Sequence, residues 1–284
     1  MLTPAPAATP SMGGPRMSDS SHWYAQDGGK WSPLYTPEKN YTLREARKDK
    51  EAGKVVMPSV TTYFKVLHKQ ALLDWKMEQV AKAAWLGLQM GHHLMIDEAG
   101  FIDSTVSAAD NASKPAADRG TAIHAAIENC IAGEPYDAAM EPYVVAAMKE
   151  REALGIKSLG IETACGSLEH GYAGKCDEHA EGMTVLDHKS RKSGKQKTPK
   201  VASYSTDRLQ LSAYGYALFG DAFFLSGRGI ILGISTTNPG LVTPHVFTGP
   251  ELLPAFEAFL ALCAVWRFEN NFDPRITTSN ESKN

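Results

Sequence analysis

Three short segments of alternating polar and apolar residues follow one another in the second half of the chain. They cover residues 160–168, 171–179 and 183–190, and turns that contain Gly or Glu-Gly separate them. Alternation with period two is typical of strands, and turns this short connect antiparallel neighbours. The chain is therefore expected to build a sheet from consecutive antiparallel strands.

Helical spacing predominates on both sides of these segments. Residues 203–219 and 250–268 carry apolar side chains at helical intervals, whereas residues 227–236 and 241–247 have the pattern of further strands. Strands mixed with helices in this way are typical of the α/β (α+β) class. We expect a mixed central sheet that is flanked by helices.

The region before the strands also has a helical pattern. Ser59 is expected to cap a long helix, and Asp118 or Thr121 is expected to cap a later helix that runs through His124. Residues 103–117 are polar and rich in Ala and Ser, and we expect them to form a loop between the two helices.

Composition excludes several classes of protein. The 284 residues include 29 Lys and Arg against 32 Asp and Glu, and 43% are hydrophobic, which suits a folded globular chain. No stretch approaches the ~18 consecutive apolar residues of a membrane span, so no membrane association is expected. The four cysteines lie far apart and form no C-x-x-C pair, which leaves neither zinc-ribbon nor iron–sulfur spacing.

Two carboxylates and a lysine fall in the predicted strands. Asp177 lies near the end of one strand, and Asp187 and Lys189 lie in the next. Because side chains alternate along a strand, Asp187 and Lys189 project from one face, with their Cα atoms roughly 7 Å apart. This spacing suits a metal ligand beside an ammonium group that acts on water.

Asp177 reaches the same face only if the turn between the two strands has an odd number of residues. A three-residue loop at 181–183 would pair Asp177 directly with Asp187, with Cβ atoms ~4.5–5.5 Å apart. A two-residue turn at Glu181 and Gly182 would place the two carboxylates on opposite faces. We expect the first register, in which they can share one divalent cation.

Further polar residues accompany these three. Gln210 and Tyr214 form an i,i+4 pair on one face of the helix expected at 203–219. Residues 189–200 contain no acidic side chain and six basic ones, namely Lys189, Arg191, Lys192, Lys195, Lys197 and Lys200. A positive segment favours a phosphate backbone, which the carboxylates alone would repel.

Each of these residues also has a simpler structural explanation. His124 can be a packing residue of its helix, Asp177 an exposed residue near a turn, and Tyr214 a core residue. Asp187 and Lys189 can form a surface ion pair of little energetic consequence, and the basic segment can be a solvated loop. Their joint occurrence in one chain favours a functional site over separate coincidences.

The order of these motifs resembles that of the PD-(D/E)XK nuclease superfamily. The matching residues are Gly120-Thr121-Ala122-Ile123-His124, Glu162, Gly174-Lys175-Cys176-Asp177, Asp187-His188-Lys189 and Gln210-Leu211-Ser212-Ala213-Tyr214. Within the superfamily they are similar to the RecB-like exonuclease branch. Pro58-Ser59-Val60-Thr61-Thr62 is similar to phage exonucleases related to the mitochondrial genome maintenance exonuclease. The resemblance spans residues 57–214 and implies a restriction-endonuclease-like fold.

The resemblance also implies a role for the matched residues. It makes Asp177, Asp187 and Lys189 catalytic, with His124, Asp177, Asp187 and the backbone carbonyl of His188 as metal ligands. Gln210 and Tyr214 would occupy the family's Q-x-x-x-Y helix and contact DNA, together with Arg191, Lys192, Lys195 and Lys197. Glu162 matches an acidic position of the family whose role stays open.

These residue types imply hydrolysis of a phosphodiester with the help of a divalent cation. Mg²⁺ suits the oxygen ligands, the imidazole makes Mn²⁺ an alternative, and the sequence leaves one ion or two open. Some relatives add a four-cysteine iron–sulfur cluster. The cysteine spacings of this chain depart from that pattern, so no such cluster is expected.

Four regions are expected along the chain. Residues 1–22 would be a disordered leader, residues 23–117 an N-terminal helical elaboration, residues 118–270 the nuclease core, and residues 271–284 a polar tail.

The expected function is a metal-dependent DNA exonuclease that acts on single-stranded DNA ends in replication, repair or recombination. The helical elaboration would narrow access to strand ends, and the compartment would be the cytosol of a bacterium or of a phage host. Two alternatives stay open. One is a recombination exonuclease that acts on duplex DNA ends, and the other is a nucleic-acid-binding module without catalytic activity. The sequence names no protein partner.

Overall fold

The computed structural model of the chain describes residues 23–36, 39–67, 70–92, 95–112 and 114–276. The expected leader and most of the expected polar tail lie outside the described residues. Within the described ranges, no helix combines the length and the apolar character that crossing a bilayer would need.

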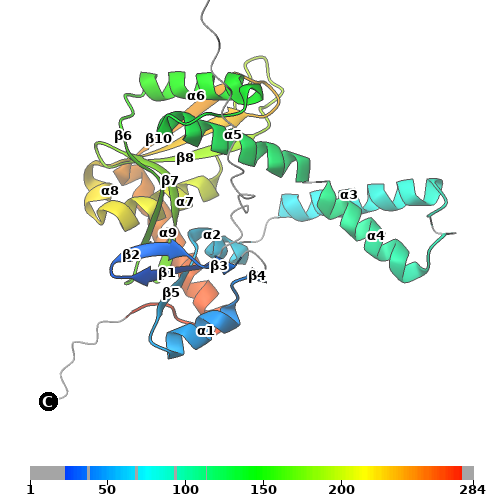
Figure 1. The fold of residues 1–284 in the computed structure, drawn as a ribbon, viewed down its shortest axis with the longest axis horizontal. Helices are drawn as coiled ribbons and strands as arrows, with labels where there is room; N and C mark the ends of the chain where they lie inside the picture. Colours follow the sequence, from blue (N-terminus) through cyan, green and yellow to red (C-terminus); the bar gives the residue numbers. More distant parts are fainter. Residues whose placement is uncertain (1–22, 37–38, 68–69, 93–94, 113, 277–284) are drawn as a thin grey trace, which may run out of the picture.

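A five-stranded sheet forms the centre of the molecule, with strand order β10-β9-β8-β7-β6 (Figure 1). Its strands are β6 (Ser158–Ser167), β7 (Tyr172–Ala180), β8 (Thr184–Arg191), β9 (Arg228–Ser235) and β10 (Val242–Thr248). Strands β8 and β9 are parallel, and every other neighbouring pair in this sheet is antiparallel. The mixed sheet confirms the expected α/β (α+β) class, and its strands match the expected segments to within two residues.

The hairpin of β7 and β8 has the register that the sequence predicts. Glu178 pairs with Leu186 and Ala180 pairs with Thr184, so the turn is centred on Gly182. Gly182 has a φ of 68°, a left-handed conformation that glycine adopts at little cost. Asp177 and Asp187 lie directly beyond the last pair of this ladder.

Helices cover both faces of this sheet. One face packs on α5 (Lys114–Ala132) and α6 (Glu141–Ala153), and the other packs on α7 (Ser205–Phe219), α8 (Ala222–Ser226) and α9 (Gly249–Asn270). Because side chains alternate along a strand, residues of one strand contact both layers of helices. Val185 and Ile231 belong to the core on the α7 and α9 side, whereas Ile234 packs with α5 and α6.

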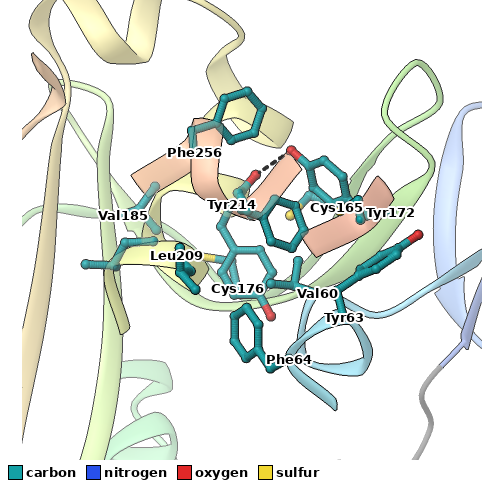
Figure 2. Close-up of a cluster of buried hydrophobic side chains, with 14 of the residues drawn as sticks. Val60, Tyr63, Phe64, Cys165, Tyr172, Cys176, Val185, Leu209, Tyr214 and Phe256 are labelled. Carbon is teal, nitrogen blue, oxygen red and sulfur yellow. Dashed lines mark hydrogen bonds between the residues drawn. The ribbon is translucent and has the colours of Figure 1, made fainter. Parts of the chain in front are cut away.

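The core on the α7 side is rich in aromatic rings. Figure 2 shows Tyr172 and Tyr214 among the buried side chains, with the Tyr172 hydroxyl donating to the Ala213 carbonyl at 2.8 Å. Tyr63 is fully buried beside them, and its hydroxyl donates to the Gly171 carbonyl at 2.6 Å. The buried hydroxyls of Tyr63 and Tyr172 therefore each have a backbone partner, as buried polar groups require.

The N-terminal region is only partly helical. It also contains a three-stranded antiparallel sheet, formed by β1 (Trp23–Asp27), β2 (Lys30–Pro33) and β5 (Val55–Pro58). A short pair, β3 (Tyr35–Thr36) and β4 (Lys39–Asn40), lies between them in sequence. Buried Trp23 packs against Trp266 of α9, so this small sheet is fixed to the main core.

The helices of the first half begin and end differently from the sequence prediction. Charged α1 (Leu43–Glu51) is followed by α2 (Val60–Tyr63), a 3₁₀ turn η1 (Phe64–Val66), α3 (Gln70–Gln89) and α4 (Glu98–Asn111). Ser59 caps α2 as expected, by accepting from the Thr62 N–H, but that helix is a single turn.

The prediction of a loop at residues 103–117 is wrong. Helix α4 occupies most of it and α5 begins at Lys114, so Asp118 and Thr121 lie inside α5 instead of capping it. Alanine has the highest helix propensity, and the alanines of this segment favour a helix despite its polar character.

Candidate active site

The two carboxylates approach each other where β7 and β8 diverge. The last pair of this ladder is Glu178 with Leu186, and beyond it the His188 backbone N–H donates to the Asp177 carboxylate (N···Oδ2 2.9 Å). The Asp177 side chain therefore takes a place that a cross-strand backbone bond would otherwise occupy. Asp187 is almost completely buried, with 1% of its side chain exposed.

Lys189 lies beside Asp187 on the α7 side of the sheet. Its Nζ is 2.7 Å from the Asp187 Oδ2 and donates to the Gln210 Oε1 of α7 at 3.0 Å. The Gln210 amide in turn donates to the Tyr214 hydroxyl at 3.4 Å. The i,i+4 pair of α7 and the strand pair Asp187 and Lys189 thus form one connected polar group.

The structure also brings His124 to this group. His124 projects from α5, and its Nδ1 lies 3.9 Å from the Asp177 Oδ2. Its ring is 6.1 Å from that of His188, centroid to centroid. Four of the five residues that the sequence analysis predicted as ligands or catalytic groups therefore lie close together where β7 and β8 diverge, namely His124, Asp177, Asp187 and Lys189.

Burial opposes the charges of both carboxylates. It raises the pKa of Asp177 to about 6 and that of Asp187 to about 7, although the Lys189 ammonium acts in the opposite direction on both. Burial also disfavours the charge of Lys189, but the Asp187 and Asp177 carboxylates raise its pKa overall. Lys189 is therefore a cation near neutral pH, but its single positive charge does not compensate the charges of both carboxylates.

The donor set fits a divalent cation. Both carboxylate oxygens of Asp187 are buried and accept no hydrogen bond of good geometry within the described structure. A cation would compensate such oxygens, and carboxylates with an imidazole suit Mg²⁺ or Mn²⁺. Among the described residues, no three His, Cys, Asp or Glu side chains already enclose an ion-sized space. The side chains of His124, Asp177 and Asp187 must therefore rotate to hold one ion together.

Glu162 lies at the edge of the same group, on β6. Its φ of 51° is left-handed, which is unusual for a residue with a side chain, and its carboxylate pairs with the Lys175 ammonium of β7. Its charge contributes to the raised pKa of Asp177. Glu162 is thus a charged neighbour of Asp177, and its role in the site stays open.

Two residues of this group were missed by the sequence analysis. Lys175 precedes Asp177 by two residues, so strand alternation would have placed it on the same face. Glu128 follows His124 by four residues in α5 and is buried, and its charge also raises the pKa of Asp177. The i,i+4 spacing was the signal that would have found it.

His188 has its side chain on the opposite side of the sheet. The ring is buried, and burial lowers the pKa of His188 well below its ordinary value, so the imidazole is neutral. Its two nitrogens lie 4.0 Å from carboxylate oxygens of Asp177 and Glu178. The backbone N–H of His188 contacts Asp177. The role of the His188 carbonyl as a metal ligand stays a prediction.

The basic segment after Lys189 divides into a fixed part and an exposed part. Arg191 makes two bonds to the Asp207 carboxylate, at 2.7 and 2.6 Å, and its guanidinium lies 4.2 Å from the centre of the Tyr204 ring. This residue fastens the segment to the start of α7. Lys192, Lys195 and Lys197 are exposed and available to a ligand.

The three buried cysteines belong to the apolar core. Cys165, Cys176 and Cys263 are packed among aromatic and aliphatic side chains, and burial raises the pKa of Cys165 to about 12. Their thiols are therefore protonated and inert. The absence of an iron–sulfur cluster stays a prediction.

Comparison with known proteins adds no family. No family model matches the chain, and no curated protein matches its sequence. Inferences about function depend on the chemistry of the residues described above.

Proposed function

We propose that the protein is a metal-dependent deoxyribonuclease that hydrolyses phosphodiester bonds at single-stranded DNA ends. The observation that carries this proposal is the buried pair of Asp177 and Asp187 beside the Lys189 ammonium. Two carboxylates with only the Lys189 ammonium beside them destabilise the fold unless a further cation binds. Such an arrangement is typical of a functional site. The motif order of the PD-(D/E)XK nucleases supports the same conclusion.

His124, Asp177 and Asp187 are the residues that would hold the ion. When bound, a divalent cation there would lower the pKa of a water molecule and neutralise charge on the phosphate. Lys189 remains protonated because two carboxylates face it. Its ammonium would therefore orient the attacking water or stabilise developing negative charge rather than act as a base.

Residues of α7 and of the basic segment would position the substrate. The Gln210 carbonyl oxygen holds the Lys189 Nζ, so the ammonium cannot swing freely. Exposed Lys192, Lys195 and Lys197 would attract the phosphate backbone by releasing its counterions. DNA is thereby drawn to a site whose own carboxylates would repel it.

A cleavage assay on end-labelled oligonucleotides tests the proposal. Wild-type protein should shorten a linear single strand with Mg²⁺ or Mn²⁺ and lose this activity in excess chelator. Single strand, blunt duplex and closed circle, tested side by side, separate the expected exonuclease from its duplex alternative. A wild-type chain that cuts none of them with either metal contradicts the proposal.

Lys189→Ala is the matched test of the catalytic assignment. It should reduce the cleavage rate by about 10²–10³-fold, because one preorganised charge at the reacting phosphate is lost. DNA binding, measured by fluorescence anisotropy, should change little. Lys157→Ala removes a lysine that is 75% exposed on the side chain and should leave cleavage unchanged.

A further inference from the structure

The helical hairpin of α3 and α4 stands apart from the body of the molecule (Figure 1). The two helices contact each other, and Phe101 of α4 packs against Gly87 of α3, where an added Cβ would come within 3.1 Å of the ring. The hairpin joins the core through contacts of α4 with α5. Most of its surface is therefore in water.

That surface is unusually apolar. Ten of the nineteen exposed large hydrophobic side chains among the described residues lie between Leu73 and Val106, and each of them is 42–79% exposed. An aliphatic side chain has roughly 60–120 Å² of apolar surface, so these ten leave on the order of 500 Å² of apolar area in water. That is within the range of the largest apolar patch of an ordinary monomer, about 300–600 Å², and such a patch is often functional.

On α3 the exposed apolar residues other than Leu86 follow one helical stripe. Leu73, Met77, Ala81, Trp85 and Leu88 recur at intervals of three and four, so they lie on the same side of the helix. Trp85 is 65% exposed and Met77 63%. An amphipathic helix normally turns such a stripe towards a core, and here it faces solvent.

The order of residues along the stripe is symmetric about its centre. Ala81 is small, Met77 and Trp85 lie four residues on either side of it, and Leu73 and Leu88 lie at the ends. In an antiparallel pair of α3 helices that crosses at Ala81, Met77 of one copy meets Trp85 of the other. Large residues then pack against large ones on both sides of a close central contact, which is the geometry of a two-fold interface.

Charge argues against nucleic acid and anionic lipid as the occupant of this surface. Within α3, Asp74 and Glu78 balance Lys76 and Lys82, whereas α4 carries three acidic residues, Glu98, Asp103 and Asp110, and no basic one. Phosphates would be repelled by this hairpin, and helices that bind anionic membranes are rich in Lys and Arg.

We propose that the α3–α4 hairpin binds a second copy of this chain, with the two hairpins forming an antiparallel four-helix bundle centred on Ala81. The exposed apolar area is comparable to what a stable interface needs, since such an interface buries about 800 Å² on each partner and a little over half of that area is non-polar. Four helices that enclose one apolar core are a stable arrangement.

The mass of the intact chain in solution is the first test. Sedimentation equilibrium of the full-length protein at tens of micromolar should give twice the chain mass. Trp85→Glu and Met77→Lys should each raise the dissociation constant more than tenfold, because a charge then faces the apolar partner. Phe268→Glu, at a position that is 88% exposed on α9, is the control and should leave the dimer intact.

Cross-linking tests the two-fold geometry. Ala81→Cys should form a covalent dimer under mild oxidation, whereas Lys82→Cys, one residue away on the exposed surface, should not. Wild-type chain oxidised in parallel accounts for Cys130. Circular dichroism of each variant verifies that the hairpin stays helical.

Three outcomes overturn the proposal. The first is a full-length chain that remains monomeric at these concentrations, even if a variant without residues 1–22 forms a dimer. The second is a dimer that survives both hairpin substitutions. The third is a hairpin substitution that leaves the mass unchanged and weakens DNA binding. None of these results depends on nuclease activity, so this proposal and the proposed function fail separately.

Discussion

The junction of β7 and β8 and the α3–α4 hairpin depart from the ordinary distribution of residues in opposite ways. Between β7 and β8, the Asp187 carboxylate is buried and the Asp177 side chain is only 16% exposed, whereas the hairpin exposes apolar side chains to water. Both arrangements cost stability in an isolated chain. We propose that binding offsets this cost in both regions, through a cation and a phosphate in the first and an apolar surface in the second.

The largest expected effect separates the two regions by their readouts. Asp187→Asn should reduce cleavage by about 10³-fold or more, because a buried ligand loses its charge while its shape is kept. The mass in solution should remain that of the wild type. Steady-state cleavage and sedimentation on the same preparation verify both statements, and an active Asp187→Asn chain would remove Asp187 from the site.

Arg191 and Lys197 provide a smaller contrast within the basic segment. Arg191→Ala should lower the free energy of unfolding by about 3 kcal/mol, because buried Asp207 then lacks its partner. Lys197→Ala should leave stability unchanged and reduce the slope of log affinity against log salt by about 1. Urea unfolding and salt titrations measure the two effects, and equal behaviour of both variants would contradict the division between a fixed and an exposed part.

Gly174 tests how closely α7 must approach β7. A Cβ at this position would come within 2.6 Å of the Tyr214 ring, which is buried and cannot move away freely. Gly174→Ala should therefore cost about 1–3 kcal/mol of stability. It should also slow cleavage, since Tyr214 contacts the Gln210 that holds Lys189. Gly182→Ala, at a turn with open space around it, is a useful comparison because only its backbone is strained.

The pH dependence of metal stabilisation gives the most graded prediction. The folded pKa values of about 6 for Asp177 and about 7 for Asp187 lie above the ordinary value of about 3.9 for Asp. Stability from these groups is thus complete below pH ~4 and is lost as the pH rises through 6 and 7. Mn²⁺ should raise the melting temperature more at pH 8 than at pH 5.5, as scanning fluorimetry would show. A shift that is equal at both pH values, or that persists in Asp187→Asn, would count against a metal at these residues.

The sequence predicted strands β6, β7 and β8 well because their pattern is local. Alternation located the three strands, and counting residues across the turn was enough to predict the register of the β7–β8 hairpin. The helix that carries Gln210 and Tyr214 followed from the 3.6-residue period. These features depend on neighbours along the chain, which a single sequence contains.

Features that depend on distant contacts could not be predicted in this way. The left-handed φ of Glu162 and its pairing with Lys175 occur where the ladder between β6 and β7 is interrupted. Arg191 looked like a phosphate ligand, and only the fold shows Asp207 facing it. The helical pattern after Ser59 gave no sign that apolar side chains of α3 face water.

Anomalous diffraction from crystals soaked in Mn²⁺, recorded near the manganese absorption edge, tests the shared cation site most directly. A single group of peaks within ligand distance of His124, Asp177 and Asp187, and beside the Lys189 ammonium, is the expected result. Manganese that binds elsewhere on the chain, or none at these three side chains in a protein that still cuts DNA, would contradict it.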